Sequence, residues 1–169
     1  MPAARERIVF EGLVAGLLAY LAVALVFAGA DLLLGRALFA TPALIGSVLF
    51  YGARGAELGR VSAGPVAAAN GVHVLLSVGI GLVAALVVEE TERHPQFFYA
   101  TFFMVVAFLF ASTAILLGVP SAITRAAPWA VTLVANVVGL AVAGAYLWRA
   151  HPRLRARVSA LSGGEEESA

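Results

Sequence analysis

The sequence contains no cysteine and no lysine, and it has few charges of either sign. Without cysteine the chain cannot form disulfides, thiolate metal sites, iron–sulfur clusters or cysteine nucleophiles. Charged residues make up 12% of the 169 positions and the formal net charge is +1, whereas an average soluble domain has about 25% charged residues. This balance excludes the basic surface that nucleic-acid binding requires.

Apolar residues, in contrast, make up 62% of the chain. One core in a domain of this size cannot bury so much apolar surface, so the excess is expected to face lipid. Four apolar runs reach the roughly 20 residues that a membrane-spanning helix needs. The predicted fold is therefore an all-α membrane protein, a single four-helix bundle within residues 1–150, with spans at about 8–30, 66–88, 97–119 and 128–148.

The first run has a second interpretation. Arg5 and Arg7 precede it and it ends in Ala28-Gly29-Ala30, a pattern that is typical of a cleaved secretory signal. However, the run is longer than the roughly 7–15 residues of a signal core, and it contains Glu11. We therefore expect it to be retained as the first span.

A further apolar run lies between the first two spans. Thr41 is placed as an N-cap and Pro42 as a first helical residue, which predicts a helix over about residues 42–52. This helix is too short to cross a bilayer, so we expect it to be embedded or re-entrant. The alternative is a fifth span from Leu32 to Tyr51, which would carry Arg36 into the bilayer at a cost of a few kcal/mol.

Arginine counts predict the orientation. With four spans, one face carries both termini and seven of the eleven basic residues: Arg5, Arg7, Arg93, Arg149, Arg153, Arg155 and Arg157. The positive-inside rule then places both termini in the cytoplasm, for a multi-pass protein of the bacterial cytoplasmic (inner) membrane.

The fourth span and the tail have clear interfacial features. Trp129 and Trp148 are 19 positions apart, about 28 Å along a helix, as expected of aromatic anchors at both interfaces. Arg149, Arg153, Arg155 and Arg157 are placed to meet lipid headgroups. The segment 151–169 is basic and then acidic, and we expect it to be a disordered cytoplasmic tail.

Polar side chains within the spans gather near one depth, at or beyond the bilayer centre on the side away from the termini. The set is Asn70, His73, Ser77, Ser112, Thr113, Thr132 and Asn136. Such a cluster either hydrogen-bonds across the bundle and sets the helix register, or forms a small polar cavity in which His73 is the titratable group. We favour the structural role and expect His73 to face Asn136 or Ser112.

Other chemistry finds no support in the sequence. Haem between helices commonly needs two axial ligands at one depth, and His73 is the one histidine within a span, with no carboxylate near it for a metal site. Glu11 stands where it would reach headgroups or pair with Arg7. The charges Glu89, Glu90, Glu92 and Arg93 are interpreted as a solvated turn. No catalytic constellation can be assembled, so we expect no enzyme activity, metal or cofactor.

Four short segments carry a resemblance that extends over most of the chain. They are Thr41-Pro42-Ala43-Leu44-Ile45-Gly46-Ser47, Asn70-Gly71-Val72-His73, Glu92-Arg93-His94-Pro95 and His151-Pro152-Arg153-Leu154-Arg155. In these the chain resembles an uncharacterised family of small bacterial four-helix integral membrane proteins. The resemblance implies an architecture and a location, and no activity.

The predicted function is non-enzymatic. We expect a structural, accessory or partner-binding membrane subunit, surrounded by lipid, whose partner is another membrane protein or a second copy of the chain. The alternative is a transporter of a small solute, ion or proton built around the polar cluster at His73. Small residues such as Gly12 and Gly16, at four-residue spacing, are expected to permit close approach of helices.

Overall fold

The computed structural model describes residues 2–54, 58, 60–94 and 96–156, and within them the regular structure is entirely helical. The elements follow in the order α1 (Pro2–Leu33), α2 (Ala40–Tyr51), α3 (Ala63–Arg93), α4 (Phe97–Ala114), the 3-10 turn η2 (Ile115–Leu117), α5 (Ser121–Ala126) and α6 (Trp129–Ala150).

Four of these helices, α1, α3, α4 and α6, are long and apolar enough to cross a membrane, and α2 is a shorter apolar helix. The predicted four spans and short additional helix are therefore confirmed. The differences lie at the ends. Helices α1 and α3 extend several residues beyond the first two predicted spans. Helix α4 ends at Ala114, before the end of the third predicted span, and one turn of 3-10 helix follows it.

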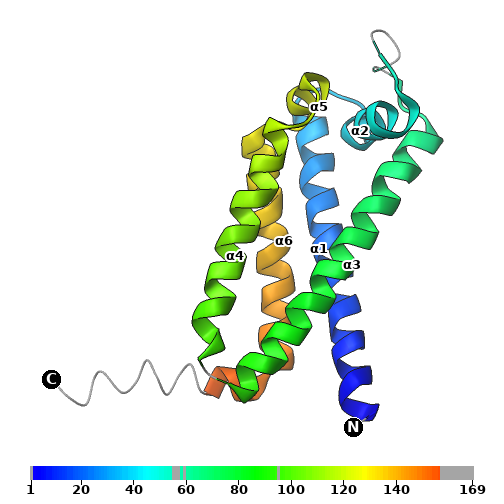
Figure 1. The fold of residues 1–169 in the computed structure, drawn as a ribbon. Helices are drawn as coiled ribbons and strands as arrows, with labels where there is room; N and C mark the ends of the chain where they lie inside the picture. The colour runs from blue at the N-terminus through cyan, green and yellow to red at the C-terminus, as the bar shows by residue number, and fades with distance from the viewer. Residues whose placement is uncertain (1, 55–57, 59, 95, 157–169) are drawn as a thin grey trace, which may run out of the picture.

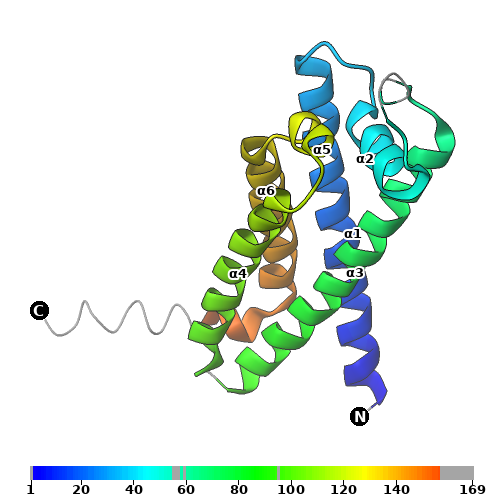
Figure 2. The ribbon, with the colours of Figure 1, turned by 45° about the horizontal axis from the view of Figure 1, so that its top comes forward.

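The helices form an elongated bundle (Figures 1 and 2). The long helix α3 crosses α1 obliquely, and α4 runs beside α6. The short helices α2 and α5 lie at one end of the bundle, here called the α2 end. The start of α1 and the segment after α6 lie at the opposite end, here called the terminal end. The first and the last described helical residues thus lie at the same end of the bundle.

Glycines allow α1 and α3 to touch backbone to backbone. A Cβ atom added to Gly12 would lie 2.6 Å from the Cα of Leu82, and one added to Gly16 would lie 2.6 Å from the Cα of Val78. On the facing helix, a Cβ on Gly81 would lie 2.7 Å from the Cα of Gly16. The expected close approach at Gly12 and Gly16 is confirmed, because any larger side chain here would separate the helices.

The apolar side chains of the bundle lie mostly on its outside. Leu25, Leu75 and Phe110 are 72%, 73% and 77% exposed, while the main core cluster is small and consists of Ala15, Ala85 and Leu147. A water-soluble protein would show the reverse distribution. Exposed leucine and phenylalanine are favourable in contact with lipid tails, so packing within the bundle depends on small residues.

Two local expectations were wrong. Thr41 does not cap α2, because the helix begins at Ala40, after Phe39 in a left-handed conformation (φ 67°), and no side chain caps it. The segment after α6 is not disordered from residue 151 onward. His151 is buried and residues 152–156 are helical, and the remainder of the predicted tail lies outside the described residues.

Candidate functional site

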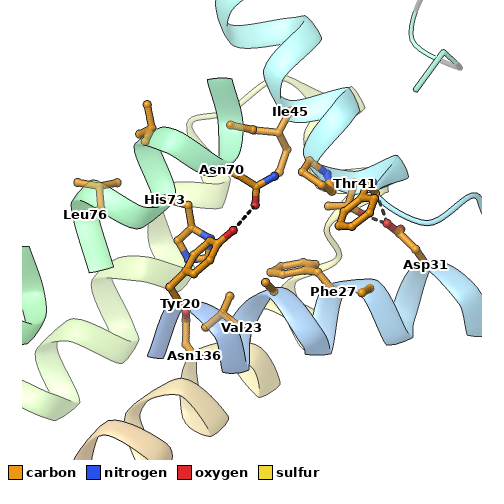
Figure 3. A pocket seen from close by; sticks show the side chains of 16 residues that line it. Tyr20, Val23, Phe27, Asp31, Thr41, Ile45, Asn70, His73, Leu76 and Asn136 are labelled. Carbon is orange, nitrogen blue, oxygen red and sulfur yellow. Dashed lines mark hydrogen bonds between the residues drawn. The ribbon is translucent and has the colours of Figure 1, made fainter. Parts of the chain in front are cut away.

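A pocket of about 330 Å³ lies between α1, α2 and α3. Figure 3 shows its walls, which are mostly apolar and include Val23, Phe27, Ile45 and Leu76. A few polar side chains also line it: Tyr20, Asp31, Thr41, Asn70, His73 and Asn136. The three helices meet here because α2 packs against α1 and α3 at this end of the bundle (Figure 2).

Tyr20 organises the polar part of the pocket. Its hydroxyl donates a hydrogen bond to Oδ1 of Asn70 at 3.0 Å, and Nδ2 of Asn70 donates to the carbonyl of Val66 one turn earlier at 2.9 Å. The Tyr20 ring also meets the His73 ring edge to face, with centroids 5.3 Å apart. Within the described part of the chain the His73 nitrogens have no hydrogen-bond partner, so the imidazole retains a donor and an acceptor.

The predicted polar cluster is divided between this pocket and the helix contacts around it. Asn70, His73 and Asn136 line the pocket together. Nδ2 of Asn136 donates to the Ser112 hydroxyl at 2.9 Å, which links α6 to α4. His73 therefore shares a cavity with Asn136, while Ser112 bonds to Asn136 and to its own helix.

The other members of the cluster lie apart from the pocket. Ser77 is buried at the contact of α3 with α1, beside Gly16. The Thr113 hydroxyl donates to Leu109 of its own helix. The Thr132 hydroxyl is buried without a hydrogen-bond partner among the described residues. None of these side chains is among the described residues that line the pocket.

A buried carboxylate closes the α2 end of the pocket, and sequence reasoning missed it. Asp31 is completely buried. It accepts hydrogen bonds from the Thr41 hydroxyl at 2.7 Å and the Thr41 backbone amide at 2.9 Å, and it forms an ion pair with Arg36 at 3.0 Å. Arg36 also donates to the carbonyl of Ala126 in α5 at 3.0 Å. One carboxylate thus joins α1, α2 and α5.

A second buried charged network lies at the terminal end. His151 is 1% exposed and stands between two carboxylates, with Nε2 3.0 Å from Glu11 and Nδ1 3.1 Å from Glu92. The backbone amide of Leu154 donates to the same Glu92 oxygen. The network links α1, α3 and the end of α6. The Nδ1 contact is within ion-pairing distance but does not have hydrogen-bond geometry.

The predicted solvated turn at Glu89–Arg93 was therefore wrong for two of its members. Glu89 is buried and accepts hydrogen bonds from both Arg7 and Arg93, while the Glu92 side chain is 10% exposed. The physical reason is that α3 continues to Arg93 and packs this turn against α1 and α6. The expected pair of Glu11 and Arg7 is present at 3.8 Å, in addition to the contact with His151.

The charges of this terminal network favour a structural role over a metal site. Ligand atoms of Glu89, Glu92 and His151 lie within 4.8 Å of one another, but both Glu89 oxygens already bind arginines. Nε2 of His151 is likewise already engaged by Glu11 at 3.0 Å.

The predicted interfacial residues lie near the ends of α6. Trp129 is 65% exposed at its start, and Trp148 is 40% exposed near its end. Arg149, Arg153 and Arg155 are exposed at the terminal end, and Arg157 lies outside the described residues. Their positions suit contact with the two membrane interfaces, and that contact stays a prediction.

Comparison with protein-family models, curated proteins and solved structures found no match for this chain.

Proposed function

We propose that the chain is a non-enzymatic protein of the bacterial cytoplasmic membrane that binds a small molecule in the pocket between α1, α2 and α3. Both termini lie in the cytoplasm in this proposal, as the arginine counts predict, so the pocket belongs to the outer half of the bilayer. The proposal keeps the non-enzymatic role expected from the sequence and uses part of the predicted polar cluster as binding groups.

The observation that carries the proposal is the composition of the pocket wall. Small-molecule sites are concave, mostly apolar, and contain a few polar groups that orient the ligand, with volumes of about 300–1,000 Å³. This pocket has about 330 Å³, apolar walls and a converging set of Tyr20, Asn70 and His73. A His73 ring that retains both its donor and its acceptor supports ligand binding over a purely structural role for this residue.

The contact between α1 and α3 on the terminal side of the pocket favours ligand binding over transport. Toward the terminal end, α1 and α3 touch at Gly12, Gly16 and Gly81, where not even a methyl group fits between the backbones. A solute that passed from the pocket toward the cytoplasm along this seam would have to separate the two helices. A binding protein that receives its ligand from the outer side or from lipid needs no such opening.

A pair of tryptophan substitutions on one helix tests the proposal. Ala24 lines the pocket, and the adjacent Leu25 is 72% exposed on the lipid-facing side. We expect Ala24→Trp to fill the cavity and Leu25→Trp to leave it intact. The protein is extracted from its native membrane in polymer nanodiscs without detergent, and the small molecules that remain bound are identified by mass spectrometry.

The expected result is a molecule retained by the wild type and by Leu25→Trp, and lost from Ala24→Trp. Circular dichroism on all three proteins confirms that each is folded. If the two variants and the wild type retain the same molecules in the same amounts, the pocket is not a binding site. If the protein instead moves solutes across proteoliposomes in a manner that Ala24→Trp abolishes, the transport hypothesis replaces this one.

A further inference from the structure

We infer that the ligand of this pocket is an electrically neutral amphiphile with a hydroxyl or carbonyl head, an inference that depends on the proposed binding function. Three features of the pocket point to this class: its balanced charge, the hydrogen-bonding groups that remain uncommitted, and the separation of those groups from an apolar wall.

The pocket offers no net charge to a ligand. Asp31 is the only ionisable acid or base besides His73 and Tyr20 among the described residues that line it, and it is completely buried. Its carboxylate is neutralised by Arg36 at 3.0 Å and accepts two hydrogen bonds from Thr41. A cationic ligand would have to displace Arg36, and an anionic ligand would find no unpaired positive group. An ionic ligand would lose its hydration on entering the pocket and would gain no opposite charge in return.

The uncommitted polar groups suit a neutral head. The Tyr20 hydroxyl and the Asn70 carbonyl oxygen already bond to each other. What remains is the His73 ring, the second amide hydrogen of Asn70 and the Oδ1 of Asn136, which has no partner among the described residues. A neutral imidazole has one donor and one acceptor, so a hydroxyl that both donates and accepts matches it, and a carbonyl matches the donors alone.

The remaining wall suits an apolar body. Phe27 and Ile45 lie between the Tyr20–His73 pair and the Asp31–Thr41 pair, as Figure 3 shows. A ligand whose head meets His73 would therefore lay its chain against Phe27 and Ile45. Burial of that chain supplies the non-directional part of the affinity, and the head supplies orientation.

The test uses three photoreactive probes that differ only in the head group. Each carries the same diazirine-bearing alkyl chain, with a hydroxyl, a carboxylate or an ammonium head. Each probe is added at neutral pH to the full chain in nanodiscs, labelling is normalised to the amount of probe in the bilayer, and labelled peptides are mapped by mass spectrometry. Wild type, Leu25→Trp, Ala24→Trp and His73→Phe are compared.

We expect the hydroxyl probe to label pocket peptides in the wild type and in Leu25→Trp, and Ala24→Trp to abolish this labelling. The two ionic probes should label the pocket at least about tenfold less than the hydroxyl probe, because the pocket does not compensate the desolvation of a charge. His73→Phe should reduce labelling by the hydroxyl probe several-fold while the helical content stays unchanged, since it removes the binding partner of the head and keeps the ring.

The outcomes separate this inference from the function on which it depends. Pocket labelling by an ionic probe that equals or exceeds labelling by the hydroxyl probe would overturn the neutral class and leave a binding pocket in place. If no probe labels the pocket above the level seen in Ala24→Trp, the binding function itself fails. Hydroxyl labelling that is unchanged in His73→Phe would show that the head does not meet His73, against the orientation inferred here.

Discussion

The contact between α1 and α3 can be tested with two alanines placed two residues apart. A Cβ atom on Gly81 would overlap the Gly12 carbonyl oxygen and lie 2.7 Å from the Cα of Gly16. Both obstacles are backbone atoms, which cannot rotate away. A Cβ on Gly79, on the same helix, meets nothing within 4 Å. Gly81→Ala therefore forces the two helices apart, and Gly79→Ala serves as its matched control.

The size of the effect follows from these distances. Insertion of a methyl group into a closely packed contact costs about 1–3 kcal/mol. Replacement of glycine by alanine in the middle of a helix is otherwise favourable by about 0.5–1 kcal/mol. Both variants gain this helix-propensity term, so it cancels when they are compared. We expect Gly81→Ala to be less stable than Gly79→Ala by about 1–3 kcal/mol, the cost of the inserted methyl group. Its helical content should remain near that of the wild type, because each span remains helical in lipid on its own.

The free energy of unfolding is measured by steric trapping in bicelles for both variants and the wild type. Equal stability of Gly81→Ala and Gly79→Ala would contradict the close backbone contact between α1 and α3. The contact would also be contradicted if Gly81→Ala is destabilised but its α1–α3 distance, measured between spin labels on introduced cysteines, is unchanged. The absence of native cysteine makes such labels site-specific.

The same unfolding assay tests three polar contacts. His151→Ala should cost about 1–3 kcal/mol because it removes the buried hydrogen bond to the Glu11 carboxylate. Adding Glu11→Gln should cost much less than the sum of the single changes, and strict additivity would exclude the contact. Asp31→Asn should lower the free energy of unfolding by about 3 kcal/mol, the low end for a broken buried ion pair, because Arg36 keeps some access to solvent. Amide hydrogen exchange should increase in α2 and α5 alone. Unchanged stability would argue against the contacts by which Asp31 joins α1, α2 and α5. A double-mutant cycle of Asn136→Ala and Ser112→Ala should give a coupling of about 0.6 kcal/mol, at most about 1.7, and zero coupling would contradict the hydrogen bond between α6 and α4.

The architecture was predictable because it depends on quantities that can be read locally. Length and apolar composition decide whether a segment can span a bilayer, and the chain has four such runs and one that is too short. The confirmed glycine contact was predictable for a similar reason, since small residues at four-residue spacing mark one face of a helix. The helix ends were less predictable, because charged residues such as Glu89 and Glu92 can continue a helix when packing against other helices shields them from solvent.

The polar contacts were not predictable in the same way, because they join residues far apart in the chain. Glu89 and Glu92 look like a solvated turn when only their neighbours in sequence are considered, and their burial depends on Arg7 and His151, which lie 82 and 59 positions away. Thr41 illustrates a competition: its hydroxyl bonds to Asp31 rather than to the start of its own helix. Asn70, His73 and Asn136 line one cavity, but depth along the spans could not indicate which members of the predicted cluster would reach it, because this depends on the rotation of each helix.

The pairing of Glu11 with His151 has a consequence for biosynthesis. The two residues are 140 positions apart, and synthesis proceeds from the N-terminus at about 5–20 residues per second. Glu11 is therefore made long before His151 and cannot contact it until α6 has been synthesised. The carboxylate can meet its imidazole only after residue 151 has been made, so every product truncated before that residue lacks this contact.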